Sequence, residues 1–358
     1  MFSGKISKVL KTLKSPRMIM SLITLLVLAA IIYLSRHELL RAWELLGTAN
    51  VGLLALLLPA QIIVYYAGGE MIFSYLRDRK LIKHVSRLEQ VRIALELNLV
   101  NHIFPSGGVS GISYTTWRMS KLGVSSARST FAQLLRYVTG FLSMLAMMIV
   151  AVVFLAVDGR INRYIVASSF LVVVVVLSLT FAIMYMFSSR HRMHKAARRI
   201  ARGLNAITKC VTFGMQRQLV RVEQMDVFFS DMHDDFSELM QDKRLIVKPF
   251  LWGIVYASFD ILMFMLAFWS LGASVNPAVL LIGYIAAGFA GIIIFTPGGA
   301  GVYETIMILF LSMTGTPPDI AIAGIILTRV ILLMGTIVLG YIFYQHALIK
   351  YGKPHRDS

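Results

Sequence analysis

Long apolar runs alternate with short polar segments along most of the chain, and this pattern predicts membrane-crossing helices. Uncharged stretches of 17 or more residues recur, and about 20 apolar residues are enough for a helix to cross a bilayer. β-Barrel strands would instead alternate polar and apolar residues over short segments. We therefore expect an all-α polytopic membrane protein. Its six predicted full spans are residues 18–34, 51–76, 137–157, 164–187, 250–271 and 320–345.

Two further apolar segments are interrupted by proline and glycine, which predicts re-entrant hairpins. Residues 91–104 are too few to span and stop at the Pro-Ser-Gly-Gly sequence 105–108, and residues 277–313 are broken at 296–301. The tips read alike, FPSGGVSG and FTPGGAGV, and they enter from opposite sides if both termini share one side. Matching broken segments in two halves are typical of inverted-repeat transporters. The alternative is an eight-span bundle whose glycine-rich joints are ordinary turns.

These segments divide the chain into four parts. The first membrane half, 1–187, contains the hairpin near 92–117, and the second membrane half follows the linker. That linker, 188–248, is basic and amphipathic in its first part and acidic in its second. The basic part fits a helix lying on the headgroup surface. The remaining parts are the second half, 249–345, with its hairpin near 277–313, and a basic tail, 346–358.

The charge balance predicts the orientation of the chain. It has 35 Lys and Arg against 18 Asp and Glu, a formal net charge of +17, and 57% hydrophobic residues. Such an excess in a soluble protein would suggest nucleic acid, but here the basic residues lie beside apolar spans and no recognition motif accompanies them. The positive-inside rule places both termini and the linker on the cytoplasmic side of the cell (inner) membrane. We expect the basic loops to contact anionic lipid headgroups there.

The sequence offers no sign of an enzyme. Its single cysteine, Cys210, excludes an intramolecular disulfide and a cysteine-based metal cluster. No nucleophile, zinc or nucleotide-binding motif is present, so we expect no catalytic residue, cofactor or metal. The basic start of the chain leads into an apolar run without an obvious cleavage site, which favours an uncleaved first helix over a signal peptide.

Ionisable residues inside the apolar segments are the first candidates for function, because they are costly in a bilayer and usually face a cavity. Asp260 and Arg329 lie deepest, and a guanidinium such as that of Arg329 can clamp a phosphate with two hydrogen bonds. Glu70, Glu96 and Arg136 lie near span ends, where structural pairing explains them equally well. At the tips, the free N–H groups of a restarting helix attract anions.

The stretch PGGAGVYETIMILFL resembles the flippase-like family named after the membrane region of lysylphosphatidylglycerol synthases. The resemblance covers about residues 18–345, and in the first half it places Arg118 at an expected arginine within PSGGVSGISYTTWRMSKLGV. The chain departs from the family pattern at Ser113, Tyr303 and Leu135. The resemblance implies a lipid translocase, or a protein of that fold in envelope biogenesis, and we expect no cytosolic aminoacyl-transferring domain.

We therefore expect a flippase for an anionic or phosphate-bearing lipid, such as a modified phospholipid or a polyprenyl-linked intermediate, whose headgroup lies between the two tips. One alternative is an ion-coupled small-solute transporter. Another is a non-transporting scaffold that recruits an envelope-biosynthesis enzyme through the linker. The candidate substrate-binding residues are Gly107, Gly108, Arg118, Arg136, Asp260, Pro297, Gly298, Gly299, Gly301, Glu304 and Arg329.

Overall fold

The computed structural model describes residues 26, 33, 36–104, 109–157, 159, 163–211, 221–293 and 301–351. Within these residues the chain folds into helices joined by short turns, without a β-strand, as predicted for an all-α protein. The predicted first span, 18–34, lies outside the described residues except for Leu26 and Tyr33. Both predicted hairpin tips, 105–108 and 296–300, also lie outside them.

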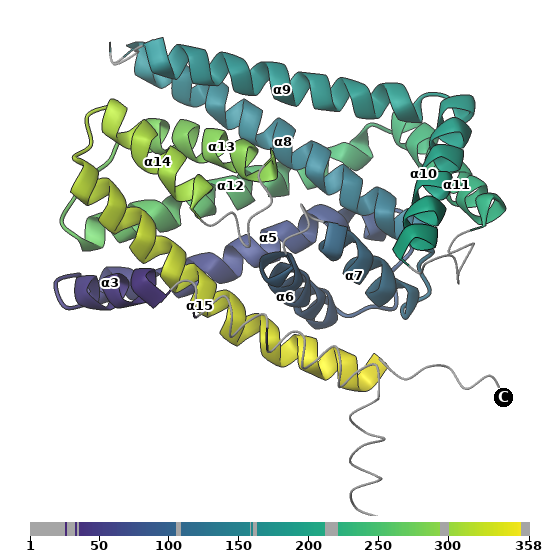
Figure 1. The fold of residues 1–358 in the computed structure, drawn as a ribbon, viewed down its shortest axis with the longest axis horizontal. Helices are drawn as coiled ribbons and strands as arrows, with labels where there is room; N and C mark the ends of the chain where they lie inside the picture. The colour runs from purple at the N-terminus through teal and green to yellow at the C-terminus, as the bar shows by residue number, and fades with distance from the viewer. Residues whose placement is uncertain are drawn as a thin grey trace, which may run out of the picture.

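The helices follow the order of the predicted segments (Figure 1). Those before the linker are α3 (Arg36–Leu46), α4 (Val51–Ala55), α5 (Leu57–Asp78), α6 (Arg87–Ile103), α7 (Val109–Ser120), α8 (Ser126–Val157) and α9 (Arg163–Phe187). The others are α10 (Arg190–Val211), α11 (Val222–Gln241), α12 (Arg244–Ser270), α13 (Pro277–Ile293), α14 (Val302–Met313) and α15 (Pro318–Tyr351).

Five helical stretches in the described residues are long and apolar enough to cross a membrane, which makes this a multi-pass membrane protein. They coincide with five of the six predicted spans. These stretches are Val51–Asp78, Ser126–Val157, Arg163–Phe187, Arg244–Ser270 and Pro318–Tyr351. The pairs α6–α7 and α13–α14 are shorter helices that contact each other within each pair. They occupy the positions of the two predicted hairpins.

Two long helices connect the short pairs (Figure 1). Helix α15 packs against both α6 and α14, and α8 packs against both α7 and α13. Helix α5 lies along α12, so the two membrane halves are in direct contact. Each short pair is therefore held between the same two long helices, one from each half of the chain.

Glycines allow the helices of the two halves to approach closely, as is common where membrane helices meet. A Cβ atom built on Gly340 of α15 would lie 2.7 Å from the Leu99 Cβ and 3.1 Å from the Leu95 carbonyl oxygen, both on α6. A Cβ on Gly253 of α12 would lie 2.3 Å from the Ser143 Oγ on α8. Neither position has room for a side chain.

Gly340→Ala is expected to destabilise the protein by about 1–3 kcal/mol, because the added methyl group forces α15 away from α6. Thermal unfolding of the purified protein in detergent measures the effect. Gly203→Ala on α10 is the control, since nothing lies within 4 Å of a Cβ built at Gly203 and alanine favours a helix over glycine. An equal loss of stability in both variants would contradict the close contact.

The linker helices α10 and α11 pack onto the first membrane half. Figure 1 shows the two helices side by side across the ends of α8 and α9. The apolar side of α10, with Met193 and Ala197, is buried in the same cluster as Met232 of α11. The sequence predicts that this basic helix lies on the headgroup surface. In the structure, α11 covers the apolar side of the helix.

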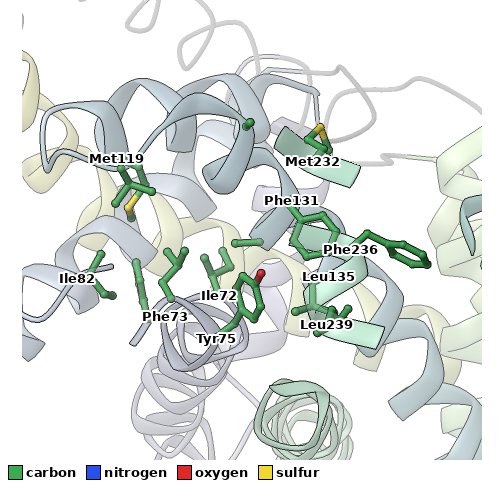
Figure 2. Packing of buried hydrophobic residues seen from close by; sticks show 14 of the residues in the cluster. Ile72, Phe73, Tyr75, Ile82, Met119, Phe131, Leu135, Met232, Phe236 and Leu239 are labelled. Carbon is green, nitrogen blue, oxygen red and sulfur yellow. The ribbon is translucent and has the colours of Figure 1, made fainter. Parts of the chain in front are cut away.

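The cluster that receives α11 is the main core at this end of the molecule (Figure 2). Its side chains come from every helix from α5 to α12 and from the turn after α5, which fixes the linker to the membrane helices. The labelled members in Figure 2 are Ile72, Phe73, Tyr75, Ile82, Met119, Phe131, Leu135, Met232, Phe236 and Leu239.

Candidate functional site

The start of α14 carries an acidic side chain that serves two purposes. Gly301 has a φ of 86°, a conformation that glycine adopts without strain, and helix α14 begins directly after it. The Gly301 N–H donates to the Glu304 Oε2 at 2.6 Å, so the carboxylate satisfies a free N–H group at the helix end. Its negative charge also interacts favourably with the positive end of the helix dipole. The same carboxylate forms an ion pair with Arg329 of α15.

A row of tyrosines extends from this ion pair toward α12. The Arg329 guanidinium lies 4.8 Å from the centre of the Tyr303 ring, and the Tyr303 ring meets the Tyr284 ring edge to face at 6.1 Å. The Tyr284 hydroxyl donates a hydrogen bond to the Asp260 carboxylate. We call Asp260, Tyr284, Tyr303, Glu304 and Arg329 the central polar cluster. Its members come from four helices of the second half.

Arg136 of α8 brings a further positive charge near this cluster. A Cβ built on Gly68 of α5 would lie 3.4 Å from both the Arg136 Nη2 and the Tyr256 ring, so these two side chains lie side by side. Tyr256 is close enough to sense the charges of both Asp260 and Arg136. Tyr256 therefore stands between the central polar cluster and the arginine from the first half.

Arg136 differs from the other arginines of the site because it has no acidic partner among the described residues. Its Nη1 is buried and donates no hydrogen bond to any of those residues. An unpaired guanidinium inside a candidate span is costly. Arg136 thus carries a positive charge that no carboxylate of the described residues compensates.

The first short helix pair and the second both contact the helix that carries Arg329, since α6 and α14 each pack against α15. Near the end of α6, the His102 Nδ1 donates to the Asn98 carbonyl oxygen at 2.8 Å. Gly111 at the start of α7 leaves room for Asn101, since a Cβ there would lie 2.1 Å from the Asn101 Oδ1. Helix α15 therefore lies against one short helix of each pair.

Arg118 lies in a separate cluster within the first half. Only 1% of its side chain is exposed. Its Nε donates to the Glu96 Oε2 at 3.2 Å, and it forms a second ion pair with Glu89. The Tyr114 hydroxyl donates to the same Glu96 oxygen at 2.8 Å, and the Tyr351 ring lies 4.1 Å from the guanidinium. These contacts tie α6, α7 and the end of α15 together, so the geometry gives Arg118 a structural role.

The structure brings together three of the predicted site residues, Asp260, Glu304 and Arg329. Arg136 lies near Tyr256, which is four residues before Asp260 on α12. Gly301 positions Glu304. The other candidates, Gly107, Gly108, Pro297, Gly298 and Gly299, lie outside the described residues.

The carboxylate of Glu70, which the sequence singled out as ionisable within a span, is bound by Arg87 at 3.0 Å and by Arg77. Glu70 is therefore a paired structural residue.

Sequence reasoning missed the tyrosines of the site. Tyr256 and Asp260 are four residues apart on α12, a spacing that places them on one helix face. Tyr284 and Tyr303 have no such signal, because they approach Asp260 and Arg329 only through the packing of α13 and α14. Among the described residues, no group of three or more His, Cys, Asp or Glu side chains is arranged to hold a metal ion.

Comparisons with known proteins agree with the family resemblance. A family model described as the lysylphosphatidylglycerol synthase TM region matches residues 18–340. The chain is similar to the UPF0104 membrane protein MJ1595 of Methanocaldococcus jannaschii, with 23% identity over 266 residues that cover 74% of this chain and 76% of that protein. No solved structure matches the chain.

Proposed function

The chain belongs to the lysylphosphatidylglycerol synthase TM-region family, and on this premise we propose that it is a flippase for an anionic or phosphate-bearing lipid in cell-envelope biogenesis. The family suggests a role in lipid or envelope biogenesis. The finer proposal, movement of such a lipid across the membrane, is supported by the charges of the site. In this proposal α6–α7 and α13–α14 are re-entrant hairpins of an inverted repeat.

The observation that carries the proposal is the guanidinium of Arg136, which has no acidic partner in the described part of the chain. A phosphate bound there would supply the missing negative charge and accept two parallel hydrogen bonds from the planar guanidinium. Neutral or cationic headgroups would leave the charge uncompensated within the membrane. The site therefore favours an anionic group, such as the phosphate of a modified phospholipid or of a polyprenyl-linked intermediate.

Arg329 offers a second phosphate position that is already occupied by an internal anion. In the proposed cycle, the lipid phosphate replaces Glu304 on Arg329, and Glu304 keeps its hydrogen bond to the Gly301 N–H. Exchange of one anion for another avoids leaving either charge unpaired, which would cost several kcal/mol. Tyr256, Tyr284 and Tyr303 supply hydroxyl groups between the two arginines. Rocking of one half against the other would then expose the site to alternate sides.

Arg136→Gln is expected to lower the amount of anionic lipid that co-purifies with the protein at least tenfold, because charge-assisted hydrogen bonds contribute about 1.5–3 kcal/mol each. Mass spectrometry of the lipids retained after gentle purification measures this. Flipping of a fluorescent anionic phospholipid by protein in vesicles should fall in parallel.

Arg128→Gln is the matched control on the same helix. Its side chain is 47% exposed and faces Asp235 at 3.8 Å, so lipid retention and flipping should stay at the wild-type level. Equal retention and flipping in Arg136→Gln and wild type would overturn the flippase proposal. Full function of Arg136→Gln in cells would favour the alternative of a non-transporting scaffold.

Helix α10 of the linker carries an exposed basic surface. His191, Lys195, Arg198 and Arg202 line a cavity of about 460 Å³ on α10, and none of them forms an ion pair with the described residues. Helix α10 begins at Arg190, directly after span α9 ends at Phe187. Because this face starts near the membrane boundary, we propose anionic lipid headgroups as its partner.

A further inference from the structure

A long apolar groove lies between α8, α12 and α13, away from the linker helices. Its volume is about 780 Å³, which is within the usual range for small-molecule sites. Side chains such as Met147, Phe154, Phe259 and Met265 line it. The groove joins the first membrane half, through α8, to the second half, through α12 and α13.

The groove offers nothing that would hold a polar ligand. No charged residue lines it, and its two polar side chains are Ser258 and Asn276. The Ser258 hydroxyl faces the Met147 sulfur at 3.9 Å. The Asn276 Oδ1 accepts from the backbone N–H groups of Ala278 and Val279 at 2.9 and 3.4 Å, which caps α13. The lining therefore favours an apolar occupant.

The groove opens onto the exposed surface of a candidate membrane span. Val150 and Phe154, which line it, are 59% and 68% exposed. They belong to α8, and the opposite wall belongs to α12, both of which are candidate membrane spans. A bilayer fills such an opening with lipid chains rather than water. We propose that the groove is a binding site for the acyl or prenyl chain of a resident membrane lipid.

The proposed binding site for the lipid chain is distinct from the central polar cluster. Asp260 and Ser258 are two residues apart on α12, and in a helix such positions point in different directions. Asp260 is buried and bound to Tyr284, whereas Ser258 is exposed beside the groove. The proposed occupant is therefore a lipid held at the contact between the two halves, and not the transported headgroup. It does not depend on the flippase proposal.

Photocrosslinking with a phosphatidylcholine that carries a diazirine in its acyl chain tests the proposal on the full chain. After detergent washing, adducts mapped by mass spectrometry are expected to be at least tenfold more frequent on groove residues such as Met147 and Met265 than on Phe170 and Phe181. The latter are exposed on the outer side of α9, where loosely bound lipid is washed away.

Filling the groove provides the decisive comparison. Ala146→Phe with Ala278→Phe should reduce the groove adducts at least tenfold, and Ala146→Phe alone is the second variant if the pair fails to fold. Ala167→Phe with Ala182→Phe, on the exposed side of α9, should leave them unchanged. Equal adducts on both surfaces, or groove adducts that persist after filling, would overturn the proposal. Crosslinks from the groove to a second copy of the chain would also overturn it.

Discussion

Arg118→Met is expected to destabilise the folded protein by about 3–5 kcal/mol, the usual cost of removing one partner from a buried ion pair. The substitution keeps most of the side-chain volume but removes the charge. It leaves Glu89 and Glu96 close together without the cation that both of them bind. Thermal unfolding in detergent should show a large fall in Tm, because the contacts that Arg118 makes between α6, α7 and α15 are lost.

Two variants make this prediction specific. Arg92→Met removes a cation that is 45% exposed and 3.6 Å from Glu89, and such surface pairs contribute about 0–1 kcal/mol. Adding Glu89→Gln and Glu96→Gln to Arg118→Met should restore part of the lost stability, because no unpaired carboxylate remains. A stable Arg118→Met protein that loses its bound lipid would instead support the substrate-binding role that the family resemblance implies.

The ion pairs of Arg118 illustrate a feature that the sequence could not predict. Its partners lie 22 and 29 positions earlier in the chain, and only the packing of α6 against α7 brings them within bonding distance. Hydropathy located the spans because burial in lipid imposes an apolar composition on every residue of a span. Ion pairs impose no such pattern, so the sequence did not show that Arg118 is paired twice whereas Arg136 has no acidic partner among the described residues.

The sequence pointed to those residues of the candidate site whose charge alone is unusual within an apolar segment. Asp260, Glu304 and Arg329 stood out because a charge within an apolar segment is costly wherever it points. The tyrosines of the site carry no such cost. Only Tyr256 lies at a helical spacing from Asp260, whereas Tyr284 and Tyr303 approach the site through the packing of α13 and α14. The burial of the apolar side of α10 was also missed, since an amphipathic helix has the same pattern whether a membrane or another helix covers it.

The Glu304–Arg329 ion pair leads to the second prediction with a large expected effect. If lipid phosphate and Glu304 compete for Arg329, the two single neutral variants should change lipid retention in opposite directions. Arg329→Gln removes the binding group, so retained anionic lipid should fall at least tenfold. Glu304→Gln removes only the competitor, so retained anionic lipid should rise. A glutamine oxygen can still accept from the Gly301 N–H, and the start of α14 should remain intact.

The rate of flipping should nevertheless fall in both variants, because release of the lipid requires the Glu304–Arg329 ion pair to form again. The rates are measured with the fluorescent anionic phospholipid in vesicles, and retention is measured by mass spectrometry of the same preparations. Asp319→Asn, which neutralises an exposed carboxylate at the start of α15, is the control and should change neither quantity. If Glu304→Gln and Arg329→Gln both reduce retention and stability to the same extent, the pair is a structural contact and the exchange of anions is wrong. A purely structural ion pair cannot explain opposite changes in lipid retention together with a shared loss of flipping. Breaking such a pair from either side would lower stability and retention in both variants.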